Sequence, residues 1–165
     1  VRKMKKVMII LFSYLGMENV YDFAFKELKE DDDLIIFGVI EKDLPKINKL
    51  ISNTTLGEKL SKKLEKDITE VYKQRANEAL ETGFQIGKRK NISTKRKLIN
   101  TTSICSLSEI INIEEIDHLI INYTSEKFFE KYILDCSLKK ILDELEIPYT
   151  LFYDGEKFDK KSRLN

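Results

Sequence analysis

Three continuous apolar runs constrain the fold of this chain more than any other feature. They are Val7–Phe12 (VMIILF), Leu34–Ile40 (LIIFGVI) and Leu119–Ile121 (LII). A strand that is apolar on both sides has to be covered on both faces, as the strands of a parallel sheet are. Between the first two runs, apolar residues recur at helical spacing, at Val20, Phe23, Ala24 and Leu28. This pattern predicts a β-α-β unit.

Strand-like and helical segments alternate along the middle of the chain as well. Residues 41–55 are polar, contain Pro45, and are expected to form a long loop. An apolar stripe then predicts the longest helix, with members Leu56, Leu60, Leu64, Ile68, Val71, Ala79 and Leu80 and an expected end at Gly83. A third strand is expected within residues 84–102, where two basic triplets interrupt the apolar residues.

The last third of the chain completes this alternation. Three segments are expected there: a short helix over Ser106–Ile113, a long helix over residues 129–145, and a strand over Tyr149–Tyr153. Ser106 or Ser108 is the expected N-cap of the short helix. Residues 154–165 are expected to form a charged tail. The sequence therefore predicts a single α/β domain over residues 1–165, a Rossmann-like, five-stranded, mainly parallel open sheet with helices on both faces.

Charge and hydropathy exclude some classes of partner. Lys and Arg number 29 and Asp and Glu number 28, so the net charge is +1 and no global field attracts nucleic acid or an anionic membrane. The longest apolar run, Val7–Phe12, is far shorter than the roughly twenty residues that span a bilayer. We therefore expect no membrane-spanning segment.

Cysteine and histidine give no sign of a metal or a catalytic site. Cys105 and Cys136 lie far apart and form no C-x-x-C motif, so neither a disulfide framework nor a zinc site is indicated. Both cysteines are expected to be core residues, in a protein of the reducing cytoplasm. His118 is expected at the beginning of the fourth strand, opposite the edge where ligands bind, and hence in no catalytic role.

Two basic triplets form a local concentration of positive charge. Lys88-Arg89-Lys90 and Lys95-Arg96-Lys97 place six positive charges within ten residues, an arrangement that can grip nucleic-acid phosphates. No aromatic residue stands between them to stack on bases. A solvated strand edge or loop is the favoured interpretation, and nucleic-acid binding through residues 88–97 stays an alternative.

Ligands of an open parallel sheet bind outside the carboxyl ends of the strands. The corresponding segments are 13–16, residues from Glu41 onward, and 122–137. Gly16 stands alone, so the glycine cluster of a P-loop or dinucleotide-binding fold is absent, and no nucleophile–base pair is evident in these segments. We therefore expect no enzymatic activity.

The order of these segments resembles that of the universal stress protein family. Lys5-Lys6-Val7-Met8-Ile9-Ile10 matches the family's opening basic dipeptide and apolar strand, and Ala24 matches the small residue of its first helix. The closing segment aligns without gaps to the family pattern G-2x-G-9x-G-[ST]. It places Tyr123, Glu126 and Cys136 on the three glycine positions and Ser137 on the hydroxyl position. Pro148 and the strand after it match the family's proline-bounded last strand.

The resemblance implies the fold but argues against the family's usual ligand. Glycines at these three positions let backbone wrap the phosphates, and here side chains replace all three. The carboxylate of Glu126 would also repel a triphosphate. The family's acidic residue after strand one is missing, since Phe12 or Ser13 stands there, and only Ser137 and the backbone at Val39 or Ile40 stay compatible with a nucleotide.

The resulting prediction is a non-enzymatic regulatory or stress-response module with a degenerate pocket (Ser13, Val39, Tyr123, Glu126, Cys136 and Ser137) and no cofactor. The alternative is an ATP- or AMP-binding universal stress protein with an altered pocket. The resemblance further implies a homodimer formed through the strand Tyr149–Tyr153, whose apolar edge would need a partner. The signal and any protein partner are not predicted.

Overall fold

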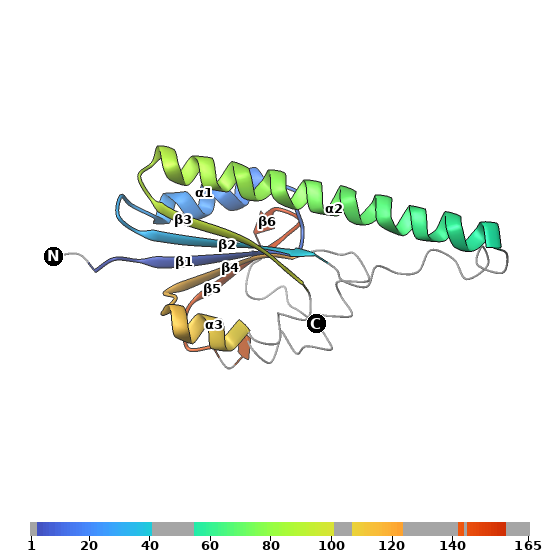
Figure 1. Ribbon diagram of the computed structural model, residues 1–165. Coiled ribbons are helices and arrows are strands. Elements are labelled where there is room, and N and C mark those ends of the chain that lie inside the picture. The colour runs from blue at the N-terminus through green and yellow to red at the C-terminus, as the bar shows by residue number, and fades with distance from the viewer. Residues whose placement is uncertain (1–2, 41–54, 101–106, 124–141, 144, 158–165) are drawn as a thin grey trace.

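The computed structural model describes residues 3–40, 55–100, 107–123, 142–143 and 145–157 (Figure 1). The described elements, in chain order, are β1 (Lys6–Leu11), α1 (Met17–Glu27), β2 (Asp33–Ile40), α2 (Thr55–Arg89), β3 (Ser93–Asn100), α3 (Leu107–Glu114), β4 (His118–Tyr123), β5 (Tyr149–Tyr153) and β6 (Glu156–Lys157). The described strands form one sheet in the order β3-β2-β1-β4-β5-β6. The predicted open α/β sheet is confirmed.

The sheet is parallel from β3 to β5, and β1 lies at its centre. Ile9 of β1 pairs with Ile36 on one side and with Ile120 on the other, so the three apolar runs of the sequence are adjacent strands. The sixth strand, β6, was not predicted and pairs antiparallel with β5. Asp154 and Gly155 connect the two with positive φ angles of 47° and 88°. Residues 154–157 are thus a hairpin turn and a strand, and not the beginning of a charged tail.

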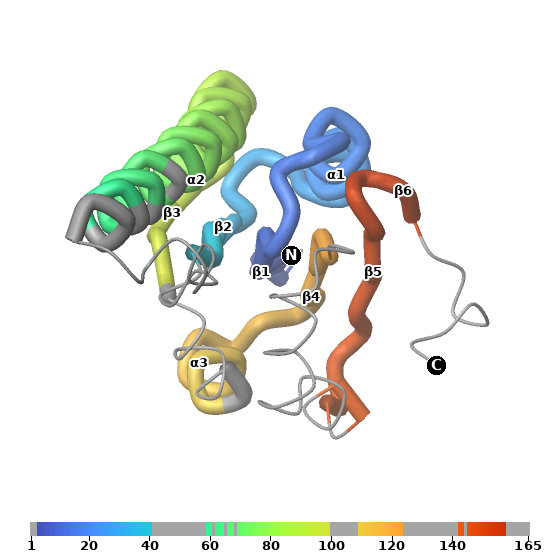
Figure 2. Tube along the Cα trace, turned by 90° about the vertical axis from the view of Figure 1, so that its right-hand side faces the viewer, coloured from blue at the N-terminus to red at the C-terminus, as the bar shows by residue number. Residues whose placement is uncertain are grey.

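Helices cover both faces of the sheet. In Figures 1 and 2, α1 and α2 lie on one face and α3 lies on the other. Alternate residues of β1 serve the two layers: Val7, Ile9 and Leu11 pack in the core under α1 and α2, whereas Met8, Ile10 and Phe12 pack in the core that includes Ile111 of α3. Burial on both sides is the reason for the unbroken apolar runs.

Helix α2 does not end at Gly83 as predicted but continues to Arg89. Two glycines inside the helix let it approach the sheet. A Cβ atom on Gly83 would lie 2.6 Å from Cδ1 of Ile36, and one on Gly87 would lie within van der Waals overlap of Thr94. Glycine here serves close packing and does not stop the helix. None of the helices among the described residues combines the length and apolarity needed to cross a membrane.

The other predicted elements differ in detail. The third strand is confirmed within the expected interval and forms the described sheet's edge at Ser93–Asn100. Helix α3 begins at Leu107, so Ser108 is its second residue and not its N-cap. Ser106, residues 41–54, and all but the last few residues of the expected helix over 129–145 lie outside the described residues.

Candidate functional site

The carboxyl ends of β1 and β4 mark the point where the strand order reverses, because β2 lies on one side of β1 and β4 lies on the other. This switch point is where doubly wound α/β sheets bind their ligands. The groups here come from the loop between β1 and α1, the end of β4, and the turn between β5 and β6. We call the place where these three segments meet the switch-point crevice.

Asn122 connects the segments of the switch-point crevice. Its side chain is fully buried, and its Nδ2 donates to the backbone carbonyls of Ser13 at 2.9 Å and Leu15 at 3.1 Å. Its Oδ1 accepts a hydrogen bond of 2.9 Å from the backbone N–H of Gly155. A buried amide needs such partners, since an unpaired polar group in the interior is costly. Asn122 therefore fixes the β1–α1 loop against the β5–β6 turn.

The β5–β6 turn packs directly on the β1–α1 loop. The Ser13 hydroxyl donates to Oδ1 of Asp154 at 2.7 Å and accepts the Leu15 backbone N–H at 3.1 Å. Gly16 and Gly155 face each other with φ angles of 62° and 88°, and a Cβ atom on Gly16 would lie 2.6 Å from Cα of Gly155. Both positions require glycine. The chain's own backbone fills this part of the switch-point crevice.

Tyr14 covers the carboxyl end of β2. Its hydroxyl donates to the backbone carbonyl of Val39 at 2.7 Å. Burial raises the pKa of the Tyr14 phenol well above its ordinary value of 10, so the hydroxyl stays protonated and remains a donor at neutral pH. Gly38 leaves room for the ring, since a Cβ atom there would lie 3.2 Å from the Tyr14 oxygen.

A cavity of about 500 Å³ lies between this loop and α2. Ser13, Tyr14 and Met17 line it from the loop, and Tyr72, Arg75 and Glu78 line it from the helix. The lining includes the guanidinium group of Arg75 and the carboxylate of Glu78, so its net charge is close to zero. A triphosphate site benefits from a surplus of positive charge, and the side chains that line this cavity supply no such surplus.

The structure describes three of the six predicted pocket residues. Ser13 and Val39 lie at the same sheet edge, with Tyr14 bound to the carbonyl of Val39. Tyr123 ends β4, accepts the Asp154 backbone N–H at 2.9 Å through its carbonyl, and has its ring centroid 5.9 Å from that of Tyr153. The other three predicted residues, Glu126, Cys136 and Ser137, lie outside the described residues, as does Cys105.

Sequence reasoning missed the residues that organise this edge, which are Tyr14, Asn122 and Asp154. The dipeptide Asp154-Gly155 was a usable signal, because Asp-Gly after an apolar strand is typical of a tight hairpin. Tyr14 and Asn122 fall within the segments expected at the carboxyl ends of the strands, but nothing in the local sequence identified their roles. The two carbonyls that the Asn122 amide nitrogen binds lie 107 and 109 residues away along the sequence, and the carbonyl that the Tyr14 hydroxyl binds lies 25 residues away.

His118 begins β4 at the opposite edge of the sheet, as predicted. Its Nδ1 lies 2.5 Å from Oε1 of Glu27, and its Nε2 lies 2.8 Å from Oγ1 of Thr150. Lys5 adds an ion pair of 3.3 Å to Glu27. Burial acts to raise the pKa of Glu27, but the hydrogen bond and charge of His118, helped by Lys5, outweigh it and hold that pKa below its ordinary value.

This row of a carboxylate, an imidazole and a hydroxyl was not predicted. His118 is 8% exposed, and the ring of Phe23 packs edge-on against it. Both ring nitrogens are engaged, one with α1 through Glu27 and one with β5 through Thr150. The row therefore ties three elements together at the end of the sheet that is distant from the switch-point crevice.

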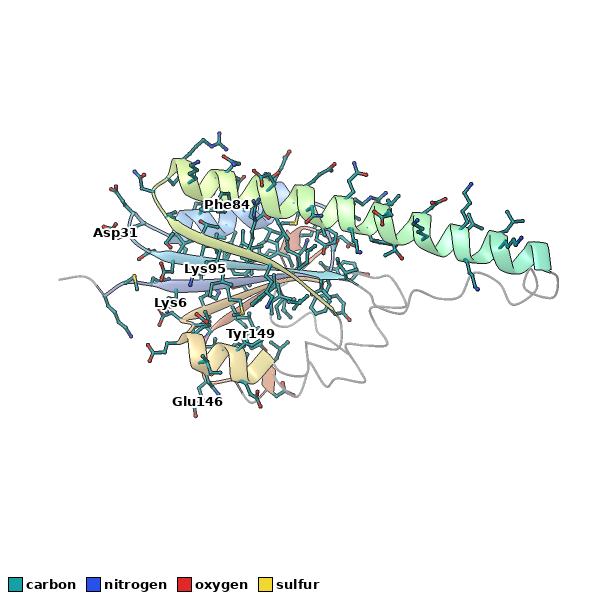
Figure 3. All side chains as sticks on the ribbon, viewed as in Figure 1. Lys6, Asp31, Phe84, Lys95, Glu146 and Tyr149 are labelled. Carbon is teal, nitrogen blue, oxygen red and sulfur yellow. The ribbon has the colours of Figure 1, made fainter. Side chains whose placement is uncertain are left out.

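The basic segment is divided between two elements. Lys88 and Arg89 occupy the last turn of α2, whereas the second triplet lies on β3. Arg96 forms an ion pair with Glu81 and lies 4.4 Å from the ring centroid of Phe84. Figure 3 shows Phe84 on the α2 side of β3 and Lys95 on the other side. The six charges do not form one continuous surface.

The described residues contain no group of three His, Cys, Asp or Glu side chains that would hold a metal ion. The parallel order β3-β2-β1-β4-β5, which reverses between β1 and β4, defines a doubly wound α/β protein. No protein-family model matches the sequence, and no curated protein matches it. Solved structures do match, and several of them are universal stress proteins.

Three of these structures illustrate the likeness. UspA from Lactobacillus plantarum is 9% identical and aligns over 92% of this chain and 99% of its own, with a TM-score of 0.53. A family protein from Arabidopsis thaliana with AMP bound is 9% identical, with coverages of 98% and 97% and a TM-score of 0.51. One from Burkholderia pseudomallei is 7% identical, with coverages of 93% and 98% and a TM-score of 0.50. The chain has the universal stress protein fold.

Proposed function

We propose that this chain is a non-enzymatic regulatory or stress-response module that uses the universal stress protein fold without binding ATP tightly. The observation that carries the proposal is the hydrogen bond from the Tyr14 hydroxyl to the Val39 carbonyl. The family resemblance places the adenine beside the backbone at this position. A base would have to displace the partly buried Tyr14 phenol before it could use that carbonyl.

The phosphate side of the switch-point crevice fits a nucleotide no better. The carboxylate of Asp154 lies there, held by the hydroxyl of Ser13 at 2.7 Å. It would repel phosphate, as would Glu126 at the position of the second family glycine. The Gly155 N–H is a backbone donor that could bind an anion, but it already donates to Asn122.

An altered but functional nucleotide pocket is the rival proposal. It is favoured by the AMP bound to the Arabidopsis thaliana structure, which shares the fold over nearly the whole of both chains. For this chain, such binding requires Tyr14 to leave Val39. The two proposals therefore differ in what Tyr14 does when nucleotide is added.

Calorimetric titration with ATP, AMP and a dinucleotide separates the two proposals. We expect no saturable heat at nucleotide concentrations up to about 1 mM, a free energy weaker than about −4 kcal/mol. The Arabidopsis thaliana protein titrated with AMP serves as the positive control. Mass spectrometry of the purified chain adds a second readout. Stoichiometric binding with micromolar affinity, or a nucleotide carried through purification, would overturn the proposal.

A non-enzymatic role is supported by the position of the Glu27–His118–Thr150 row. A general base has to reach the proton of a substrate, and His118 is buried with both nitrogens engaged. Nucleic-acid binding through residues 88–97 has less support, because Arg96 is committed to Glu81 and Phe84. The two lone cysteines of the sequence support a cytoplasmic location.

We further propose a homodimer through β5. Strand β6 pairs with Phe152 and Tyr153, so within the described residues it leaves Tyr149 to Leu151 outside the hairpin ladder. Leu151→Pro removes a backbone donor from this edge and should give a monomer. Light scattering measures the mass, and circular dichroism checks that the variant is folded. A folded variant that remains dimeric contradicts this interface.

A further inference from the structure

Helix α2 has two apolar faces, and only one of them packs on the sheet. Ala76, Ala79 and Leu80 are buried with the glycines at 83 and 87 against the strands. Leu60, Leu64 and Val71 are 47%, 40% and 47% exposed. We call these last three residues the distal stripe. The single apolar stripe expected from the sequence is therefore two stripes on different sides of the helix.

Helical geometry separates the two faces. At about 100° per residue, the distal stripe occupies a sector of about 40° and lies roughly 140° around the helix from the face that packs on the sheet. Figure 1 shows that this half of α2 extends past the carboxyl ends of the strands. The sheet therefore does not cover the distal stripe.

Charges on α2 favour an antiparallel partner of the same sequence. Residues 59–66 contain four lysines and one glutamate, a net charge of +3. Residues 67–73 contain Asp67, Glu70 and Lys73, a net charge of −1. An antiparallel pairing sets the positive segment of one helix beside the negative segment of the other, whereas a parallel pairing sets like charges together.

The same pairing aligns the distal stripe. When Leu60 of one helix faces Val71 of the other, the Leu64 side chains lie between these two contacts, each beside Asp67 of the other helix, and Lys63 comes within one residue of that same Asp67. Lys63, Asp67 and Glu70 lie on the same flank of the stripe at about 100° per residue, which is the flank where antiparallel helices exchange charges. Among the described residues, none of these three side chains forms an ion pair.

We propose that the distal stripe of α2 binds the distal stripe of a second copy of this chain in an antiparallel helix pair. Leu60, Leu64 and Val71 form its apolar seam, and Lys63 of each copy pairs with Asp67 or Glu70 of the other. This interface is separate from the edge of β5. Formation of both would link dimers into a larger assembly.

Sedimentation analysis of the full chain over a range of concentrations tests the proposal. We expect reversible association that Leu64→Gln weakens at least tenfold. Lys62→Gln is the matched control, because position 62 lies on the opposite side of the helix and is exposed. The proposal would be overturned if the wild type and Leu64→Gln associated equally, or if the wild type did not associate. Either result would mean that something other than a second α2 helix covers the distal stripe.

A charge exchange makes the test specific for this pairing. Lys63→Asp and Asp67→Lys should each weaken association, because each sets like charges together across the interface. A mixture of the two variants should restore it, since positions 63 and 67 then carry opposite charges across both halves of the pair. Association through β5 responds to neither variant. Failure of the mixture to exceed the separate variants would rule out the antiparallel register.

Discussion

Asn122 shows how much one buried amide can organise. Its side chain forms hydrogen bonds with the carbonyls of Ser13 and Leu15 and with the N–H of Gly155, and its Nδ2 also lies 3.6 Å from Sδ of Met17. Asn122→Ala should lower the free energy of unfolding by about 3 kcal/mol, because two carbonyls and an N–H lose their partner in the interior. Urea denaturation measures this loss. Asn112→Ala, at an exposed position on α3, is the control and should change stability little.

Glu27 predicts a pH dependence of stability. Its pKa is lowered in the folded state, so its interactions contribute fully above its ordinary pKa of 4.5 and are lost as pH falls through the folded value. Wild-type stability should therefore fall more steeply below pH 4.5 than that of Glu27→Gln. Urea titrations between about pH 3 and 6 compare the two slopes. Glu146→Gln, at an exposed position, should keep the wild-type slope.

At the scale of elements, the contact of α2 with the sheet depends on its glycines. Alanine is a better helix former than glycine by about 1 kcal/mol, yet a Cβ atom on Gly87 would overlap Thr94 of β3. Gly87→Ala should therefore destabilise the fold by about 1–3 kcal/mol, as overpacking does. Thermal unfolding measures the change. Gly87→Ala combined with Thr94→Ala, which removes the Oγ1 atom that the added Cβ would overlap, should recover part of the loss.

Elements were predictable from sequence wherever burial imposed a pattern. The runs of β1, β2 and β4 are apolar because helices cover both of their faces, and each was found in its place. Strand β3 was located only to an interval, because an edge strand can carry Lys95 and Lys97 beside its apolar residues. Gly83 was misread because a glycine needed for close packing has the same local sequence signal as a helix end.

The candidate site was less predictable than the fold. Family spacing pointed to Ser13 and Tyr123, and both lie at the switch-point crevice. The hydrogen bond from Tyr14 to Val39 and the network around Asn122 depend on how distant segments are placed in space, and side-chain patterns along the chain do not encode this placement. Val39 is described as well, whereas Glu126, Cys136 and Ser137 lie outside the described residues.

At the scale of the whole molecule, the β5–β6 hairpin, which lies last in the strand order, contacts the β1–α1 loop at the centre of the sheet. Truncation after Tyr153 removes the partners of Ser13, Asn19 and Asn122. It should lower the unfolding temperature by several degrees, roughly what a loss of 1–2 kcal/mol produces in a domain of this size. Calorimetry measures it. Truncation after Lys157 keeps every one of these contacts and should unfold at a higher temperature than the shorter chain.

The contact between the β1–α1 loop and the β5–β6 turn also sets an order of events during synthesis. Strand β1 leaves the ribosome before the other described elements, but the carbonyls that follow it wait for an amide more than 100 residues later, and that amide waits for Gly155. Until the turn has been made, the loop at the carboxyl end of β1 lacks these hydrogen-bond partners. Such long sequence separations slow folding, so the nascent chain should be most vulnerable to proteases and dependent on chaperones until the turn has emerged.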